Sequence, residues 1–343
     1  MRGVYTAAYL DALEQSFAQK RGVAHLDVGK AFGLITGTST GAIIGCGLAM
    51  GLSPFQMRDL YVTRGAKVFP RKMPSRLGFD LVKQLLGRPR HLARGDQALT
   101  EALVAVLGGT TLREIWERRG IALAIPAVNM SNFRGWVFKT PHDRMSNRRD
   151  DDYTLVDVCR ASSAAPLYRS LAAIDDPRGN GYDVFADGGL WANNPVIVGL
   201  VEALRMLEGS SEDIEIFCLG SCGKPEGQII PRTGVHRGLA PWKFGGEAAN
   251  VSIAAQEFVF DMIARMLAPH LKRSVQVVRF PSNKVPGAML KYLDLDETRP
   301  EGLDVLKRQA RHDADMTNSG IQQGTAEGLA IEALFNAMPP KAE

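Results

Sequence analysis

Cysteine is scarce in this sequence: the 343 residues contain only Cys46, Cys159, Cys218 and Cys222. No two of them form a CxxC pair, and their spacing matches no zinc-binding pattern. This scarcity argues against a disulfide-stabilised scaffold and against a cysteine-rich zinc site. It favours reduced cysteines in a cytoplasmic protein.

Long apolar runs are also missing. No window reaches about 18 uninterrupted apolar residues, and the start Met1-Arg2-Gly3 lacks the apolar core of a signal peptide. We therefore expect no transmembrane helix, so that any work at a membrane is done from its surface. The net charge of +4 is too small to indicate nucleic-acid binding.

The composition is ordinary for a globular chain, with 45% hydrophobic and 23% charged residues. Apolar periodicity predicts helices over 4–19, 42–50, 154–166, 247–267 and 303–336. It predicts strands over 31–36, 121–130, 135–139, 182–186, 214–219 and 274–280. Because no repeat or linker interrupts these segments, we predict a single α/β domain over 1–343, with a core over about 1–220 and a helical part over about 221–343.

The segment Gly37-Thr38-Ser39-Thr40-Gly41 is a G-x-S-x-G motif between an apolar run and a helix of small residues. The flanking glycines allow a sharp turn from strand to helix, which lifts the serine out of the sheet. The amides at the helix N-terminus favour developing negative charge there. The motif therefore predicts that Ser39 is a nucleophile. The alternative is a turn that binds phosphate or only packs.

A nucleophilic serine needs a base. The segment Asp187-Gly188-Gly189 follows the strand predicted over 182–186, and ligands bind at such strand ends in α/β sheets. The histidines that follow this aspartate stand in no distinctive context and are expected at the surface or in packing: His236, His270 and His312. We therefore predict a Ser39–Asp187 dyad with no histidine.

These motifs resemble those of the patatin-like phospholipases, in which a G-x-S-x-G supplies the serine and an Asp-Gly-Gly or Asp-Gly-Ala supplies the aspartate. The runs over 160–166 and 187–195 are also similar to that family, and the resemblance covers roughly residues 2–220. It implies a three-layer sandwich with a mostly parallel central sheet and helices on both faces. It also implies release of fatty acids from membrane phospholipids through an acyl-enzyme, with no metal and no other cofactor.

Two segments, 2–10 and 187–195, are most similar to bacterial anti-phage effector phospholipases of the CBASS type. This resemblance implies two partners, a phospholipid membrane surface at the inner face and an activating cyclic dinucleotide. It implies no nucleic-acid partner and assigns no residue to a nucleotide pocket. The sequence leaves open whether copies of the chain form a homo-oligomer.

One departure from the family concerns the oxyanion hole. The family begins with a strand and a loop of the form Asp-Gly-Gly-Gly-x-Arg-Gly, whose amides stabilise the tetrahedral intermediate. Here Met1, Arg2 and Gly3 match only the last three positions. We expect the natural start to lie upstream and to supply the missing loop. The alternative is a non-catalytic or weakly active ligand sensor.

The segment 64–94 carries nine basic residues and one acidic residue, Asp80. We expect it to form a mobile cap with one short amphipathic helix, broken into pieces by Pro70, Pro74 and Pro89. Leu77, Leu81 and Leu85 recur at helical spacing. Together with Phe79 they would enter the acyl region of a membrane if the segment binds one. The sequence leaves three interpretations of this segment open: it binds anionic lipid head groups, it binds an anionic nucleotide, or it is a basic face in contact with solvent only. A second charged run, over 148–152, is expected to be an exposed loop that neutralises itself.

Overall fold

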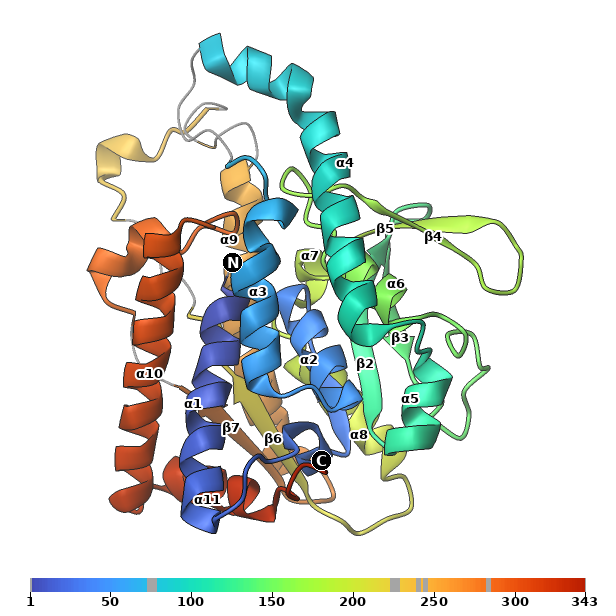
Figure 1. Ribbon diagram of the computed structural model, residues 1–343, viewed down its shortest axis with the longest axis vertical. Helices are drawn as coiled ribbons and strands as arrows, with labels where there is room; N and C mark the ends of the chain where they lie inside the picture. Colours follow the sequence, from blue (N-terminus) through green and yellow to red (C-terminus); the bar gives the residue numbers. More distant parts are fainter. Residues whose placement is uncertain are drawn as a thin grey trace.

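The computed structural model describes residues 2–72, 79–222, 229–238, 242, 246–281 and 285–342, and the side chains of these residues except 79–86. The helices are α1 Gly3–Arg21, α2 Thr40–Met50, α3 Pro54–Val68, α4 Phe79–Leu107, α5 Leu112–Arg119, α6 Leu155–Ser162, α7 Gly189–Ala192, α8 Val196–Met206, α9 Gly246–Leu267, α10 Pro300–Gln322 and α11 Ala326–Ala337. The strands are β1 Leu34–Thr36, β2 Ala122–Asn129, β3 Arg134–Lys139, β4 Ala172–Asp175, β5 Tyr182–Asp187, β6 Ile214–Leu219 and β7 Val275–Phe280. Figure 1 shows their arrangement. Among the described residues, no helix has the length and apolar character needed to span a bilayer.

Five strands form one sheet around β2. β1 runs parallel to the first half of β2, and β3 runs antiparallel along its other edge. β5 pairs antiparallel with the second half of β2, and β4 pairs antiparallel with β5. β6 and β7 form a separate, parallel pair.

β1 and β5 approach each other end to end along the same edge of β2. Thr36, the last residue of β1, pairs with Ala124, and Asp187, the last residue of β5, pairs with Ala127. Three residues of extended strand span about 10 Å. The turn that follows β1 and the carboxylate that ends β5 are therefore brought together, although Ser39 and Asp187 are 148 residues apart in sequence.

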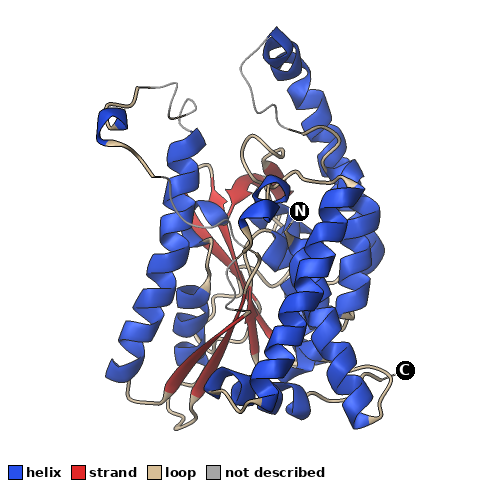
Figure 2. Ribbon diagram, turned by 90° about the vertical axis from the view of Figure 1, so that its left-hand side faces the viewer, coloured by secondary structure: helices blue, strands red, loops and turns tan. Residues whose placement is uncertain are grey.

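The prediction of a mostly parallel sheet is wrong for the five-stranded sheet, in which only β1 and β2 are parallel. Short connections are the reason for two of the three antiparallel pairs, β2–β3 and β4–β5. Residues 130–133 join β2 to β3, and residues 176–181 join β4 to β5. Such short connections join neighbouring strands only in antiparallel order. The predicted α/β class is confirmed, and Figure 2 shows the strands between helices on both sides.

Two small residues bring helices close to opposite faces of β1. A Cβ on Gly45 of α2 would lie 3.0 Å from the Ile35 side chain, and one on Gly199 of α8 would lie 2.9 Å from Thr36 Cγ2. Consecutive strand residues point to opposite faces. The helix that begins at the predicted elbow, α2, therefore packs on one face of β1, and α8 packs on the other.

The N-terminal helix α1 is buried between α3 and α10 (Figure 1). Val4, Leu13 and Phe17 are fully buried. Val4 and Leu13 lie on opposite sides of the helix, so the first turns of α1 are buried all round. The Tyr5 hydroxyl donates to Asp313 Oδ2 at 2.5 Å, which links α1 to α10. Gly22, with a φ of 65°, ends the helix in a left-handed conformation.

The expectation that residues 64–94 hold one short helix between proline breaks is wrong for α4. This helix runs for 29 residues, with Pro89 inside it. A proline in a helix interior costs about 3 kcal/mol. Further along the same helix, Leu99, Leu103 and Leu107 are buried in the core, and burying one leucine contributes about 1.5–3 kcal/mol. Packing therefore outweighs the local preference. Leu77 lies outside the described residues, as do the side chains of Phe79, Leu81 and Leu85.

The charged run over 148–152 is neutralised in part from outside, because Arg113 of α5 pairs with Asp151 and Asp152, and the run is not wholly exposed. Asp150 and Asp151 are buried, and each pairs with an arginine: Arg149 with Asp150, and Arg148 with Asp151. The Asp150 carboxylate also accepts a hydrogen bond from the amide of Lys139, which ends β3. A buried backbone donor requires such a partner.

Other segments differ in extent. Within the apolar run 31–36 only 34–36 form a strand, and the helix predicted over 154–166 ends at Ser162. The strand β4 and the helices α3 and α5 were not predicted. The four cysteines are free and buried.

Candidate active site

The turn after β1 has the strained geometry of a nucleophile elbow. Ser39 has φ 58° and ψ −119°, a conformation that non-glycine residues rarely adopt. A Cβ on Gly37 would lie 2.2 Å from the carbonyl oxygen of Gly41, so only glycine fits at position 37. A Cβ on Gly41 would meet nothing within 4 Å. Of the two motif glycines, only the first is required by close packing.

The serine and the aspartate predicted from sequence are in direct contact. The Ser39 hydroxyl donates a hydrogen bond to Asp187 Oδ2 at 2.7 Å. The other carboxylate oxygen accepts the amide of Gly189 at 2.7 Å. A Cβ on Gly188 would lie 2.3 Å from the carbonyl oxygen of Pro126 in β2, so only glycine fits at position 188. The Asp-Gly-Gly motif thus places the carboxylate and satisfies one of its oxygens.

The Asp187 carboxyl is almost completely enclosed, with 6% of the residue exposed. Burial raises its pKa to about 6, because a charged carboxylate is poorly solvated there. The hydrogen bonds from Ser39 and Gly189 oppose this rise, as does the positive charge of Arg169. A carboxylate with a pKa near 6 is ionised at neutral pH and is a stronger base than an exposed aspartate.

The segment 162–164 holds both halves of this pair. The Ser39 amide donates to Ser162 Oγ at 3.1 Å. The amide of Asp187 donates to the Ala164 carbonyl at 3.0 Å, and the amide of Gly188 donates to the Ser162 carbonyl at 3.1 Å. The serine- and alanine-rich run over 160–166 therefore hydrogen-bonds to both the elbow and the end of β5 and fixes their relative position.

A buried ion pair that sequence reasoning missed lies beside the dyad. Arg169 is 6% exposed and pairs with Asp96 of α4 at 2.9 Å. It also donates to the hydroxyl of Ser163 at 2.8 Å. The second oxygen of Asp96 accepts Arg160 of α6 at 3.0 Å. No motif marks these residues, which come from separate parts of the chain.

A narrow cavity of about 50 Å³ opens beside the serine. Most of its lining is apolar and comes from α2, α3 and α4, including Ile43, Leu60, Val68 and Leu99. Six residues with polar side chains also line it: Ser39, Thr40, Tyr61, Arg64, Ser163 and Arg169. A larger and more open hollow of about 740 Å³ lies between the loops at 209–213 and 268–275, and it contains neither dyad residue.

The remaining motif residues surround the elbow. The Thr38 hydroxyl donates to the Ala192 carbonyl at 2.6 Å, and Tyr61 donates to the Thr40 carbonyl at 2.9 Å. A Cβ on Gly3 would lie 2.7 Å from the Tyr61 ring, which places the start of α1 beside the start of α2. The Arg2 carbonyl accepts amides of the first turn of α1.

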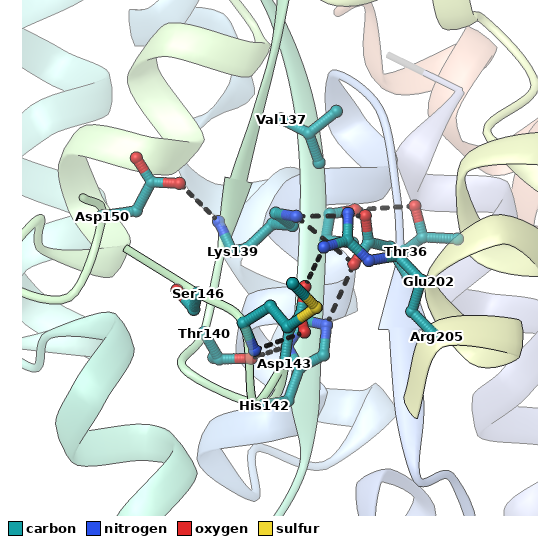
Figure 3. Close-up of polar contacts among 12 residues, drawn as sticks. Thr36, Val137, Lys139, Thr140, His142, Asp143, Ser146, Asp150, Glu202 and Arg205 are labelled. Carbon is teal, nitrogen blue, oxygen red and sulfur yellow. Dashed lines mark hydrogen bonds and ion pairs between the residues drawn. The ribbon is translucent and has the colours of Figure 1, made fainter. Parts of the chain in front are cut away.

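The histidines His236, His270 and His312 are exposed, as predicted. His142 is buried elsewhere, in a polar cluster between the end of β3 and α8 (Figure 3). Its Nε2 lies 3.3 Å from Glu202 Oε2, and Lys139 pairs with the same carboxylate at 3.2 Å. Ser39 and Asp187 take no part in this cluster, which joins α8 to the sheet. Within the described ranges, no group of three or more His, Cys, Asp or Glu side chains is placed to hold a metal ion.

Comparisons with known proteins place these features in context. A family model described as patatin-like phospholipase matches residues 1–200. A "cGAMP-activated phospholipase" of Vibrio cholerae is 31% identical over 90% of this chain and 86% of its own length. One of Escherichia coli is 34% identical over 96% of this chain and 85% of its own length. "Patatin-like protein 2" of Arabidopsis thaliana is 28% identical over 62% of this chain and 52% of its own length.

Proposed function

Because this chain belongs to the patatin-like phospholipase family, we propose that it is a serine lipid acyl hydrolase with Ser39 as nucleophile and Asp187 as base. The observation that carries this proposal is the 2.7 Å hydrogen bond from the strained Ser39 to the buried carboxylate. A serine in an ordinary turn needs neither the strain nor the buried base.

In the proposed reaction, Asp187 accepts the hydroxyl proton of Ser39 as Oγ attacks the carbonyl carbon of a phospholipid ester. The tetrahedral intermediate collapses, the ester C–O bond breaks, and the leaving alkoxide takes the proton back from Asp187. An acyl-enzyme remains on Ser39. Water then attacks the acyl carbonyl as Asp187 takes its proton, and the fatty acid leaves as that proton returns to Oγ.

The oxyanion is proposed to lie where two helices begin. The N-termini of α1 and α2 both lie against Tyr61, through Gly3 and Thr40. Helix N-termini carry partial positive charge and unpaired amides. Amides near Gly3 would therefore stabilise the developing charge, and Arg2 and Gly3 would hold the first turn of α1 in place.

Substrate would reach the serine along the apolar cavity. Its lining suits methylene groups, and Arg64 stands exposed at the same cavity, on the basic segment 64–94. Anionic head groups attract such cations when a protein lies on a membrane surface. We therefore propose a phospholipid membrane surface, at the cytoplasmic face, as the partner of this side of the molecule.

A cyclic dinucleotide is proposed as activator. The support is that the relatives from Vibrio cholerae and Escherichia coli, which are 31% and 34% identical over most of this chain, are cGAMP-activated phospholipases. An anti-phage role would follow from such gating. The alternative, a ligand sensor without hydrolysis, has no need for a buried carboxylate that is hydrogen-bonded to a strained serine.

The test is fatty-acid release from phospholipid vesicles by the native chain and by Ser39→Ala, each with and without cGAMP. The proposal predicts release by the native chain, stimulated by cGAMP, and none by Ser39→Ala. Thr100→Ala, which removes an α4 hydroxyl bonded to the backbone of its own helix, serves as a matched control and should retain release. Equal release by the native chain and Ser39→Ala would refute the proposal, and cGAMP binding without release would favour the sensor.

A further inference from the structure

Arg169 lies beside the dyad, because it lines the same cavity as Ser39. It donates to Ser163, and the neighbours of Ser163 in the chain, Ser162 and Ala164, accept the amides of Gly188 and Asp187. The positive charge of Arg169 opposes the rise in the pKa of Asp187. Its guanidinium is held from two sides, by Asp96 of α4 at 2.9 Å and by the Ser163 hydroxyl at 2.8 Å. A second bond, to the Ser163 carbonyl at 3.3 Å, fixes its direction. With 6% of the residue exposed, Arg169 has little water to screen its charge.

We propose that Arg169 is a positioning residue of this site: its clamped, buried positive charge holds the Asp187 carboxylate in the ionised form that accepts the serine proton. This inference rests on the proposed function, because it concerns the base of that reaction. It adds Arg169, which the motifs do not contain. It also adds a series of charged side chains that runs from Asp96 of α4 through Arg169 to Asp187 at the end of β5.

There is a physical reason for the contacts that Arg169 makes with Asp96 and Ser163. A free arginine beside a buried carboxylate would fold down onto it, form a direct salt bridge and compete with the serine for the carboxylate oxygens. Here the two oxygens of Asp187 are already used, one by Ser39 and one by Gly189. Asp96 and Ser163 keep the guanidinium on its own partners, so that it acts on Asp187 through its field.

Charged groups on the surrounding elements complete the environment. On α6, Arg160 pairs with the second oxygen of Asp96, and Asp157 lies 3.9 Å from Arg160. On α3, Arg64 lines the same cavity, and Asp294 and Asp296 flank the cavity residue Leu295. On α9, Glu257 accepts Asn193 just beyond α7. Of all these groups, Arg169 bears directly on Asp187.

The experiment measures how fast a fluorophosphonate probe labels Ser39 between pH 4.5 and 9, in the full-length chain with cGAMP present. In this reaction Oγ bonds to phosphorus, fluoride leaves, and Asp187 takes the proton. The labelling rate therefore follows the ionised fraction of Asp187. The midpoint of this pH profile does not depend on how much of a sample is folded.

The variants are Arg169→Gln and Arg169→Met, which remove the charge, Arg169→Lys, which keeps it, and Arg160→Gln as the matched control. Arg160 binds the other oxygen of the same Asp96, whereas the oxygens of Asp187 accept from Ser39 and Gly189. Loss of a nearby opposite charge raises a carboxyl pKa by about one unit or more. We therefore expect both neutral variants to move the midpoint up by about one pH unit, with labelling near pH 5 falling about tenfold.

The Arg169→Lys midpoint is expected to stay near that of the native chain even if its plateau rate falls, and the Arg160→Gln midpoint is expected not to move. Unchanged midpoints in the neutral variants would overturn the inference while leaving the proposed function intact. So would an equal shift in Arg160→Gln, because the effect would then belong to the whole ion-pair cluster. Absence of labelling of the native chain at every pH would instead refute the proposed function, and the inference with it.

Discussion

Replacing Asp187 by asparagine should remove hydrolysis and, at the same time, make the protein more stable at neutral pH. The carboxylate is buried, and its pKa is raised from 3.8 to about 6. At about 1.4 kcal/mol per pKa unit, holding it ionised costs the folded state about 3 kcal/mol. Asparagine has the same shape, can accept the Gly189 amide and can donate to Ser39, so the contacts of the site are kept.

The pH dependence of this gain has a definite sign. Well below pH 4 the aspartate is protonated in both the folded and the unfolded chain, and the cost is absent. Between about pH 4 and 6 the folded state binds more protons, so native stability falls as the pH rises. The stability difference between Asp187→Asn and the native chain should therefore grow from about 0.5 kcal/mol at pH 4 to about 3 kcal/mol at pH 8.

The assay is urea unfolding followed by tryptophan fluorescence at both pH values. Asp59→Asn, at an exposed position of α3, is the control and should change the free energy of unfolding by less than about 0.5 kcal/mol. A less stable Asp187→Asn variant at pH 8 would refute the reasoning. So would a gain that is the same at both pH values, since burial of the charge would then not be its cause.

Three further predictions follow from the packing. Gly37→Ala and Gly188→Ala should each destabilise the fold by more than about 1 kcal/mol and abolish labelling of Ser39 by the fluorophosphonate probe. The reason is that their Cβ atoms would lie 2.2 and 2.3 Å from backbone carbonyl oxygens. Gly41→Ala, whose Cβ would meet nothing within 4 Å, should be tolerated when all three variants are compared by thermal unfolding and by probe labelling. Ala102→Phe should fill the cavity beside Ser39 and reduce hydrolysis of long-chain esters at least tenfold relative to acetyl esters, in a chain-length series; an equal loss for both would show that the cavity does not hold the acyl chain. Pro89→Ala, at an exposed position inside α4, should increase the free energy of unfolding by up to about 3 kcal/mol and so raise the midpoint of urea unfolding. A lower midpoint would show that the proline does not destabilise the helix.

The elbow and the aspartate motif were predictable because their signals are local. Gly37 stands between an apolar strand and a helix of small residues, and the sharp turn needs glycine within a few positions of the serine. Asp187 and Gly188 stand directly after the strand predicted over 182–186. The structure adds that Gly37 and Gly188 are needed for backbone clearance, which no single sequence can distinguish from the freedom of an ordinary turn.

Strand direction was not predictable from the same signals. Apolar periodicity marks β5 as a strand but is the same for both directions of the chain. The short connection from β4, a strand of four residues that was not recognised, makes β5 antiparallel to β4 but does not fix the direction of β5 along β2. The antiparallel pairing of β5 with β2 brings the end of β5 to the end of β1, and with it Asp187 to Ser39.

Arg169 and Asp96 were missed for a related reason. They are 73 residues apart, they belong to no motif, and each looks like a surface charge in its local sequence. Their ion pair forms only in the folded protein, in which α4 packs against α6. Burial of Leu99, Leu103 and Leu107 likewise favours a continuous α4 through Pro89, against the local preference for a break. Both cases show tertiary contacts outweighing what neighbouring residues favour.

The central claim is that Ser39 is acylated with Asp187 as its base. The most direct measurement is acid quenching of the protein during turnover of a phospholipid with cGAMP present, followed by peptide mass spectrometry. The account predicts one acyl group on the peptide that contains Ser39, and none on that peptide in Ser39→Ala or Asp187→Asn. An acyl group on another residue, or hydrolysis that leaves Ser39 unmodified under single-turnover conditions, would contradict it.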